Sequence, residues 1–115
     1  MLMVDATSVF GSTGFIGSRF CELYGDNIIR VDRDDYEPKS NNILYFISTV
    51  DNYNMHESLH VDIDTNLTVL MDVLDNIDKD ADVTFNFVSS WFVYGKNYEL
   101  PFREDFSRCE PSGFY

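Results

Sequence analysis

The sequence predicts an α/β fold built on a parallel, doubly wound sheet. Three observations predict it: four short apolar runs typical of strands, two segments with apolar residues at helical spacing, and their order along the chain, β-α-β-β-α-β. Strands that alternate with long helices favour a parallel sheet covered by helices on both faces. A chain of 115 residues, of which 44% are hydrophobic, suits one such domain.

Six segments carry the signals of secondary structure. Strands are expected at residues 4–10, 28–31, 43–47 and 83–88, where the chain has short apolar runs. Helices are expected at residues 15–24 and 59–77. The first helix has Ile16, Phe20 and Leu23 at helical spacing, and Gly25 would end it. The third strand is apolar throughout, which is typical of strands buried on both faces of a parallel sheet.

The second helix has the clearest periodicity in the chain. Its expected core-facing stripe steps by three or four residues and comprises Leu59, Ile63, Leu67, Leu70, Leu74 and Ile77. The acidic residues that stay off this line are Asp62, Asp72, Asp75 and Asp78. We therefore expect a helix with an apolar face on the sheet and an acidic face in solvent.

The composition excludes several classes of partner. The chain carries 20 acidic and 8 basic residues, which gives a net charge of −12. Such a surface repels phosphate backbones and anionic membranes, so we expect no nucleic acid and no membrane as partner. No apolar run approaches the length of a membrane span. Any anionic ligand must be held by local donors against the overall field.

Cysteine usage and the first residues indicate a cytoplasmic protein. Cys21 and Cys109 lie far apart and form no CxxC pair, so both are interpreted as reduced thiols, with a single disulfide as the alternative. The first ten residues have no basic start and contain Asp5, which argues against a signal peptide.

A glycine-rich loop joins the first predicted strand to the first predicted helix. Its residues are Gly11, Ser12, Thr13, Gly14, Phe15, Ile16 and Gly17. The early glycines permit a tight turn and close approach to a pyrophosphate, and the last lets the helix pack against the strand. Free N–H groups at the helix start attract the anion. The loop is therefore predicted to bind a dinucleotide, with a turn that binds no ligand as the alternative.

An acidic residue follows the second predicted strand at the spacing expected of a ribose-binding group. Asp32 lies 21 residues after Gly11, where a carboxylate accepts hydrogen bonds from ribose hydroxyls. Because a carboxylate repels a 2′-phosphate, Asp32 predicts NAD as the cofactor rather than NADP. The adjacent Arg33, also assigned to this site, weakens that preference.

These motifs resemble the extended short-chain dehydrogenase/reductase family, the NAD-dependent sugar-nucleotide epimerases and dehydratases. "GSTGFIG" has the GxxGxxG spacing of the family, and residues 85–96, "FNFVSSWFVYGK", look like its catalytic strand end. Ser90, four residues before Tyr94, is at the position of the family's catalytic Ser or Thr. Residues 101–106, "PFREDF", are similar to its Pro-x-x-Glu-Asp loop, and Asn66 matches an asparagine near its cofactor site. The resemblance covers nearly the whole chain.

The resemblance implies a catalytic pair, Ser90 and Tyr115. Tyr115 lies 25 residues after Ser90 and four after Pro111, as in the family's Tyr-x-x-x-Lys motif. In the family, this tyrosine exchanges a proton with a sugar hydroxyl while hydride moves to or from nicotinamide, and the serine hydrogen-bonds the same oxygen. Trp91 and Phe92 stand where the dehydratases have acids, which favours epimerase or reductase chemistry on a nucleotide-sugar.

The resemblance also implies that residues 1–115 are a single, truncated NAD(P)-binding Rossmann-like domain. The motif lysine would follow Tyr115, and the family's C-terminal substrate lobe is absent, so we expect the chain to be inactive alone. In the family the helix at residues 59–77 commonly pairs with its twin, which implies a homodimer. Ser48 and Thr49 replace small residues that lie beside the family's cofactor, and they are assigned to that site.

One element of the family is missing from this sequence. Only ten residues separate Asp32 from Ile43, where the family has a helix and another strand. Its loss would place the Asp32 strand at a sheet edge and remove one wall of the adenine pocket. The expected fold is therefore a reduced Rossmann-like sheet.

Two other functions remain open from the sequence. The first is a non-catalytic dinucleotide-binding or dimerisation module. The second is a zinc hydrolase, because residues 56–60, "HESLH", satisfy the HExxH pattern that places two zinc-binding histidines on one helical face. Asp62 stands where the metalloprotease helix needs an apolar residue, and no metal site is assigned.

Overall fold

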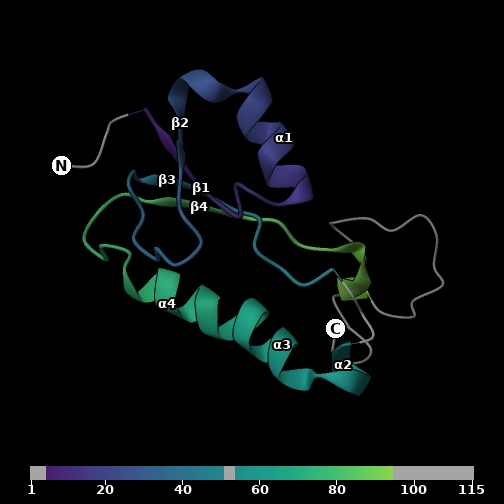
Figure 1. The fold of residues 1–115 in the computed structure, drawn as a ribbon. Coiled ribbons are helices and arrows are strands. Elements are labelled where there is room, and N and C mark those ends of the chain that lie inside the picture. The colour runs from purple at the N-terminus through teal and green to yellow at the C-terminus, as the bar shows by residue number, and fades with distance from the viewer. Residues whose placement is uncertain (1–4, 51–53, 95–115) are drawn as a thin grey trace.

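The sheet is parallel and has four strands. The computed structural model describes residues 5–50 and 54–94. The strands are β1 (Thr7–Phe10), β2 (Ile28–Arg30), β3 (Asn42–Tyr45) and β4 (Thr84–Phe87). They lie in the order β2-β1-β3-β4, and every neighbouring pair is parallel (Figure 1). The predicted order of strands along the chain is confirmed.

Helices cover both faces of this sheet, which confirms the predicted α/β class. The helix α1 (Phe15–Leu23) connects β1 to β2 and lies on one face, and α4 (Val69–Asp75) lies on the opposite face (Figure 1). The helical stretch between β3 and β4 consists of α2 (Asn54–Glu57), α3 (Leu59–Ile63), the π-helical segment η2 (Asp64–Thr68) and α4 (Val69–Asp75). Two short 3₁₀ helices are η1 (Gly25–Asn27) and η3 (Trp91–Tyr94). Within residues 5–50 and 54–94, every helix is too short or too polar to cross a bilayer.

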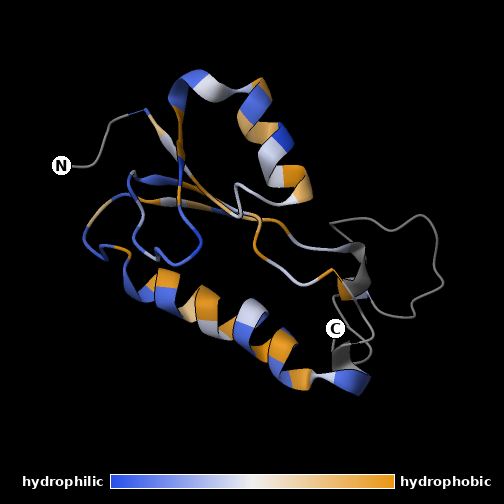
Figure 2. Cartoon of the chain, viewed as in Figure 1, coloured by the Kyte–Doolittle hydropathy of each residue, from blue (hydrophilic) through white to orange (hydrophobic). Residues whose placement is uncertain are grey.

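The connection from β2 to β3, residues 31–41, contains neither helix nor strand. Because β3 lies on the other side of β1, this connection crosses the sheet, and β2 pairs with β1 alone among the described strands. The prediction that the strand before Asp32 lies at a sheet edge is confirmed. The crossing segment is largely hydrophilic, whereas the strands and helices carry most of the hydrophobic residues (Figure 2).

Two buried serine hydroxyls attach this crossing segment to β1. Ser8 and Ser40 are 0% and 1% exposed, and their Oγ atoms are 2.8 Å apart. The Ser40 hydroxyl donates to the Asn42 carbonyl at 2.9 Å, so the Ser8 hydroxyl is the donor of the shared bond. Ser40 Oγ also accepts the Ser8 N–H, and Ser8 Oγ accepts the Lys39 N–H, both at 2.9 Å. The two hydroxyls therefore satisfy the N–H groups of Ser8 and Lys39 and the carbonyl of Asn42.

The hydrophobic core lies between the sheet and α4. Its buried residues are Phe10, Val31, Ile43, Tyr45 and Val73. Partly buried residues packed against them are Tyr36, Ile47, Leu70, Ile77, Val83 and Phe85. The core therefore joins three strands, the crossing segment and the long helical stretch into one unit.

The inner face of α1 differs from the prediction. Ile16 and Leu23 are 60% and 57% exposed, whereas the buried residues of α1 are Gly17 and Cys21. Gly17 contacts the β1–α1 turn directly, and Cys21 follows one helical turn later. Close backbone contact at Gly17 thus decides which face of α1 meets the sheet, and it turns the two aliphatic side chains outward.

In the helical stretch between β3 and β4, the residues that face the sheet also differ from the predicted stripe. The exposed members of that stripe are Leu59, Leu67 and Leu74, whereas Leu70 and Ile77 do pack on the core. Val73 is fully buried, and Asp62, predicted to lie on the solvated face, is only 3% exposed.

The predicted stripe was wrong because the side of the helical stretch that faces the sheet is polar along its first part. The stretch follows the carboxyl end of β3 and leads back to the start of β4, so its first part lies at the carboxyl edge of the sheet. The inward residues there are Asp62 and Asn66, and apolar residues take over only along α4. The π-helical segment adds a residue to one turn, which shifts the spacing further from the periodicity assumed for a regular helix.

Tyr45 gives a stability prediction, because its hydroxyl is buried without a hydrogen-bond partner among the described residues. Burial raises its pKa to about 12. Tyr45→Phe removes the desolvated hydroxyl and keeps the ring stacked on Phe87 at 5.9 Å, so we expect the free energy of unfolding to rise by about 1 kcal/mol at pH 7. Urea denaturation measures this change, and a loss of stability would contradict it.

The same substitution has a signed pH dependence. The unfolded chain loses the tyrosine proton near pH 10 and the folded chain only near pH 12, so the unfolded state binds fewer protons in this interval. The free energy of unfolding of the parent chain is therefore unaffected by this ionisation below pH 10, and it falls as the pH rises towards 12. Urea curves at pH 9 and pH 11 should show a larger loss for the parent chain than for Tyr45→Phe.

Candidate functional site

The predicted cofactor residues follow the carboxyl ends of neighbouring strands. The glycine loop follows β1, Asp32 and Arg33 follow β2, and Ser48 and Thr49 follow β3. Because the strands are parallel, these ends meet at one edge of the sheet, where open α/β sheets bind their ligands. Ser90 follows β4 at the same edge.

The glycine loop forms a compact turn between β1 and α1. Gly11 has φ +76°, a left-handed conformation that favours glycine, and the Gly14 N–H donates to its carbonyl at 3.1 Å. A Cβ atom on Gly17 would overlap the carbonyl oxygen of Gly11 and lie 2.9 Å from its carbonyl carbon. A Cβ on Gly11 would lie 3.1 Å from the backbone of Phe46, just after β3. The three glycines therefore allow contacts between backbones that side chains would prevent.

The amino terminus of α1 is open to solvent. Gly14 is the N-cap residue and provides no side-chain cap, and Thr13, Phe15 and Ile16 are exposed. The first intrahelical bond runs from the Ser18 N–H to the Gly14 carbonyl at 2.9 Å. The N–H groups before Ser18 in the first turn thus have no intrahelical acceptor, which is the arrangement that binds phosphate at helix N-termini.

A side chain of β2 contacts the glycine loop. Arg30 Nη1 donates to the Ser12 carbonyl oxygen at 3.4 Å. Sequence reasoning overlooked Arg30, although its position two residues before Asp32 places both side chains on the same face of an extended strand. Asp32 and Arg33 are exposed, and the Asp32 carbonyl accepts the Asp35 N–H at 3.1 Å in a turn.

Asn66 fastens the loop after β3 to the π-helical segment. Its Oδ1 accepts the Thr49 N–H at 2.8 Å, and its Nδ2 donates to Thr49 Oγ1 at 2.9 Å. Thr49 is 9% exposed, whereas Ser48 is exposed. The structure thus brings two predicted cofactor-site residues together and gives Asn66 a positioning contact with the loop.

An Asn66→Ala variant is expected to lose about 2 kcal/mol of stability, because the Thr49 N–H and hydroxyl both lose their hydrogen bond to Asn66 in a part-buried place. Urea denaturation measures the cost, and amide exchange at Thr49 should accelerate. Asn76→Ala is the matched control, since Asn76 Nδ2 bonds the Asp72 carbonyl at an exposed helix end. An equal cost for the two variants would contradict the positioning contact.

The predicted catalytic residues are only partly described. Ser90 is exposed, and its carbonyl accepts the Val93 N–H at 3.2 Å at the start of η3. Tyr115 and the loop at residues 101–106 lie outside the described residues. The pairing of Ser90 with Tyr115 therefore stays a prediction.

The HExxH pattern does not lie on one helix. His56 belongs to α2 and His60 to α3, and Ser58, with φ −154° and ψ 77°, separates the two helices. Two histidines on one helical face require an uninterrupted turn, so the geometry of the zinc motif is missing. Within the described ranges, no group of three His, Cys, Asp or Glu residues could hold a metal ion.

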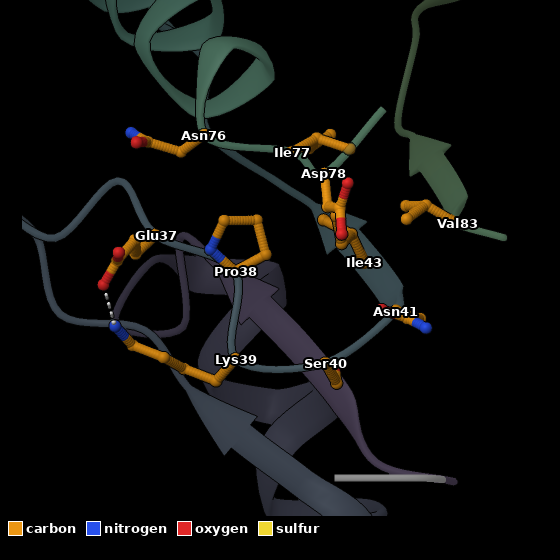
Figure 3. Close-up of a pocket in the computed structure, with 10 residues that line it drawn as sticks. All are labelled: Glu37, Pro38, Lys39, Ser40, Asn41, Ile43, Asn76, Ile77, Asp78 and Val83. Atoms are coloured by element: carbon orange, nitrogen blue, oxygen red, sulfur yellow. Dashed lines mark hydrogen bonds and ion pairs between the residues drawn. The ribbon is translucent and has the colours of Figure 1, made fainter. Parts of the chain in front are cut away.

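A cavity of about 450 Å³ lies away from the glycine loop (Figure 3). Ile43 and Val83 form part of its wall at the start of β3 and beside β4, and Glu37, Asn76 and Asp78 contribute polar groups. It opens at the amino edge of the sheet, between the crossing segment and the end of α4. It is therefore not the predicted dinucleotide site.

Comparison with solved structures identifies a neighbour of known ligand. The chain superposes with a TM-score of 0.72 on the structure of RMD from Pseudomonas aeruginosa complexed with NADPH. The two sequences are 18% identical, and the match covers 96% of this chain and 43% of that one. The likeness shows the Rossmann-like fold, and the chain spans less than half the length of that neighbour. No protein-family model and no curated protein matches the sequence.

Proposed function

We propose that this chain binds a nicotinamide dinucleotide at the carboxyl edge of its sheet, with the pyrophosphate at the amino terminus of α1. The observation that carries the proposal is the glycine loop, in which Gly11, Gly14 and Gly17 hold the backbone close and leave first-turn N–H groups without intrahelical acceptors. The complex of the structural neighbour with NADPH supports the choice of ligand. The proposal assigns the adenosine ribose to Asp32, whose carboxylate would accept hydrogen bonds from the ribose hydroxyls.

We further propose that the whole protein is an oxidoreductase or epimerase acting on a nucleotide-sugar. As the family resemblance implies, Ser90 and Tyr115 would hold and move the proton of the sugar hydroxyl, and a bound nicotinamide dinucleotide would supply or accept hydride. Leu67, Met71 and Leu74 are exposed at helical spacing on the long helical stretch and are the surface proposed for a homodimer. A non-catalytic dinucleotide-binding module is the second candidate.

Calorimetric titration of the 115-residue chain with NADH and NADPH tests the binding proposal. Saturable binding of at least one of them is expected, and Gly11→Ala should weaken it because a side chain at φ +76° strains the loop. Gly25→Ala is the control, since a Cβ there meets nothing within 4 Å. Absence of binding to both dinucleotides would overturn the proposed function.

Oxidation of NADH bound to the whole protein, in the presence of a nucleotide-sugar, separates the two candidates. Turnover that is lost in Ser90→Ala supports the enzyme, whereas binding without turnover supports the module. Sedimentation of Met71→Asp against the parent chain tests the homodimer, because a charge at that surface should shift the population towards monomer.

A further inference from the structure

Arg30 places a cationic group beside the glycine loop. Its Nη1 lies 3.4 Å from the Ser12 carbonyl oxygen, so the guanidinium lies against the loop that leads into α1. The next residue, Val31, belongs to the core on the α4 side and extends the pairing of β2 through a 3.0 Å bond to the Val9 carbonyl. Since side chains alternate along an extended strand and Val31 faces α4, Arg30 faces the α1 side, and the alternation continued beyond β2 would put Asp32 there too.

Arg30 forms no ion pair with another side chain of the described residues. Arg19 is paired with Glu22 at 3.1 Å, and Lys39 with Asp35 at 2.8 Å, whereas no ion pair in the described part of the chain includes Arg30. In a chain of net charge −12, an uncommitted guanidinium at the candidate site is the local donor that an anionic ligand requires.

The reduced sheet keeps this group accessible. Arg30 is exposed, and β2 has β1 as its single partner among the described strands. The guanidinium touches the glycine loop, and Asp32 follows Arg30 by two residues, so a ligand that extends from the loop towards Asp32 lies near this cation. In the dinucleotide, the adenosine ribose is the part that occupies this stretch.

We propose that Arg30 makes the site prefer NADPH over NADH by pairing its guanidinium with the 2′-phosphate of the adenosine ribose. The inference rests on the proposed function and deepens it. Guanidinium and phosphate form charge-assisted, bidentate hydrogen bonds, which a ribose hydroxyl cannot replace. Asp32, which alone would reject the 2′-phosphate, is then offset by a cation on its own side of the strand.

Titration of the parent chain, Arg30→Met and Arg30→Lys with NADPH and NADH at low ionic strength tests the inference. The parent chain should bind NADPH more tightly. Arg30→Met should weaken NADPH binding about tenfold, or about 1.4 kcal/mol, and change NADH binding by less than about twofold. Arg30→Lys should retain part of the preference, because the charge remains and the fork is lost. The preference should also decrease with added salt.

Two controls make the result specific. Arg19→Met removes a paired cation on the outer side of α1 and should change neither affinity, and Arg33→Met removes the cation next to Asp32. A parent chain that binds NADH as tightly as NADPH overturns the inference, as do equal losses for both cofactors in Arg30→Met or a preference that depends on Arg33 alone. If the parent chain binds neither cofactor, the proposed function falls and the inference falls with it.

Discussion

Gly17→Ala is expected to disrupt the β1–α1 unit, at a cost of about 3 kcal/mol in the free energy of unfolding. The added methyl group overlaps the Gly11 carbonyl oxygen, and its other near contacts are also backbone atoms of Gly11 and Ser12. No side-chain rotation relieves such a contact, so α1 must move away from the strand. Urea denaturation measures the loss, and calorimetry should show that dinucleotide binding is lost with it.

Gly25→Ala provides the comparison for Gly17→Ala. Gly25 begins the short helix η1, and a Cβ atom there meets nothing within 4 Å. Alanine restricts the unfolded chain more than glycine does, so this variant should be unchanged or more stable by up to about 1 kcal/mol. A Gly17→Ala variant as stable as Gly25→Ala would contradict the close contact between α1 and the glycine loop.

Ser40→Ala is expected to cost about 3 kcal/mol, because one hydroxyl serves three groups. Its removal leaves the Ser8 N–H, the Ser8 hydroxyl and the Asn42 carbonyl without this partner at a buried position. Ser8→Ala removes fewer bonds and should cost about 2 kcal/mol. Chemical denaturation of both single variants gives the costs.

The double variant Ser8→Ala/Ser40→Ala separates a coupled pair from two independent hydroxyls. Because the shared 2.8 Å bond is lost in each single variant, the double variant should cost less than the sum of the two. Ser18→Ala is the control, since Ser18 Oγ makes one long bond of 3.4 Å at an exposed position, and it should change stability by less than about 0.5 kcal/mol. Additive costs would argue against coupling.

The fold was largely predictable because its strands and turns have local signals. The short apolar runs, the glycine loop and the distance from Asp32 to Ile43 predicted the strand positions, the crossover into α1 and the strand at the edge. These features depend on residues that are close in sequence. Strand boundaries differed by up to three residues, as with β1, which begins at Thr7 rather than at residue 4.

The contacts that complete the candidate site were not predictable in the same way. Asn66 was found by resemblance, yet its two bonds to Thr49 depend on a π-helical segment that no periodicity reveals. Arg30 has no motif, and its contact with Ser12 arises only when the glycine loop folds back beside β2. The buried position of Asp62 likewise follows from the polar inward line at the edge of the sheet where the site lies.

β2 has one neighbour among the described strands, which has a consequence for the solubility of the chain. A strand with one neighbour has unpaired N–H and C=O groups along its other edge, and these can pair with another chain and cause aggregation. Proteins protect such edge strands by keeping them short and by placing charged side chains on them. β2 spans Ile28–Arg30 and ends on a cation, so it uses both kinds of protection. Arg30→Met is therefore also expected to raise the tendency of the chain to self-associate through this border.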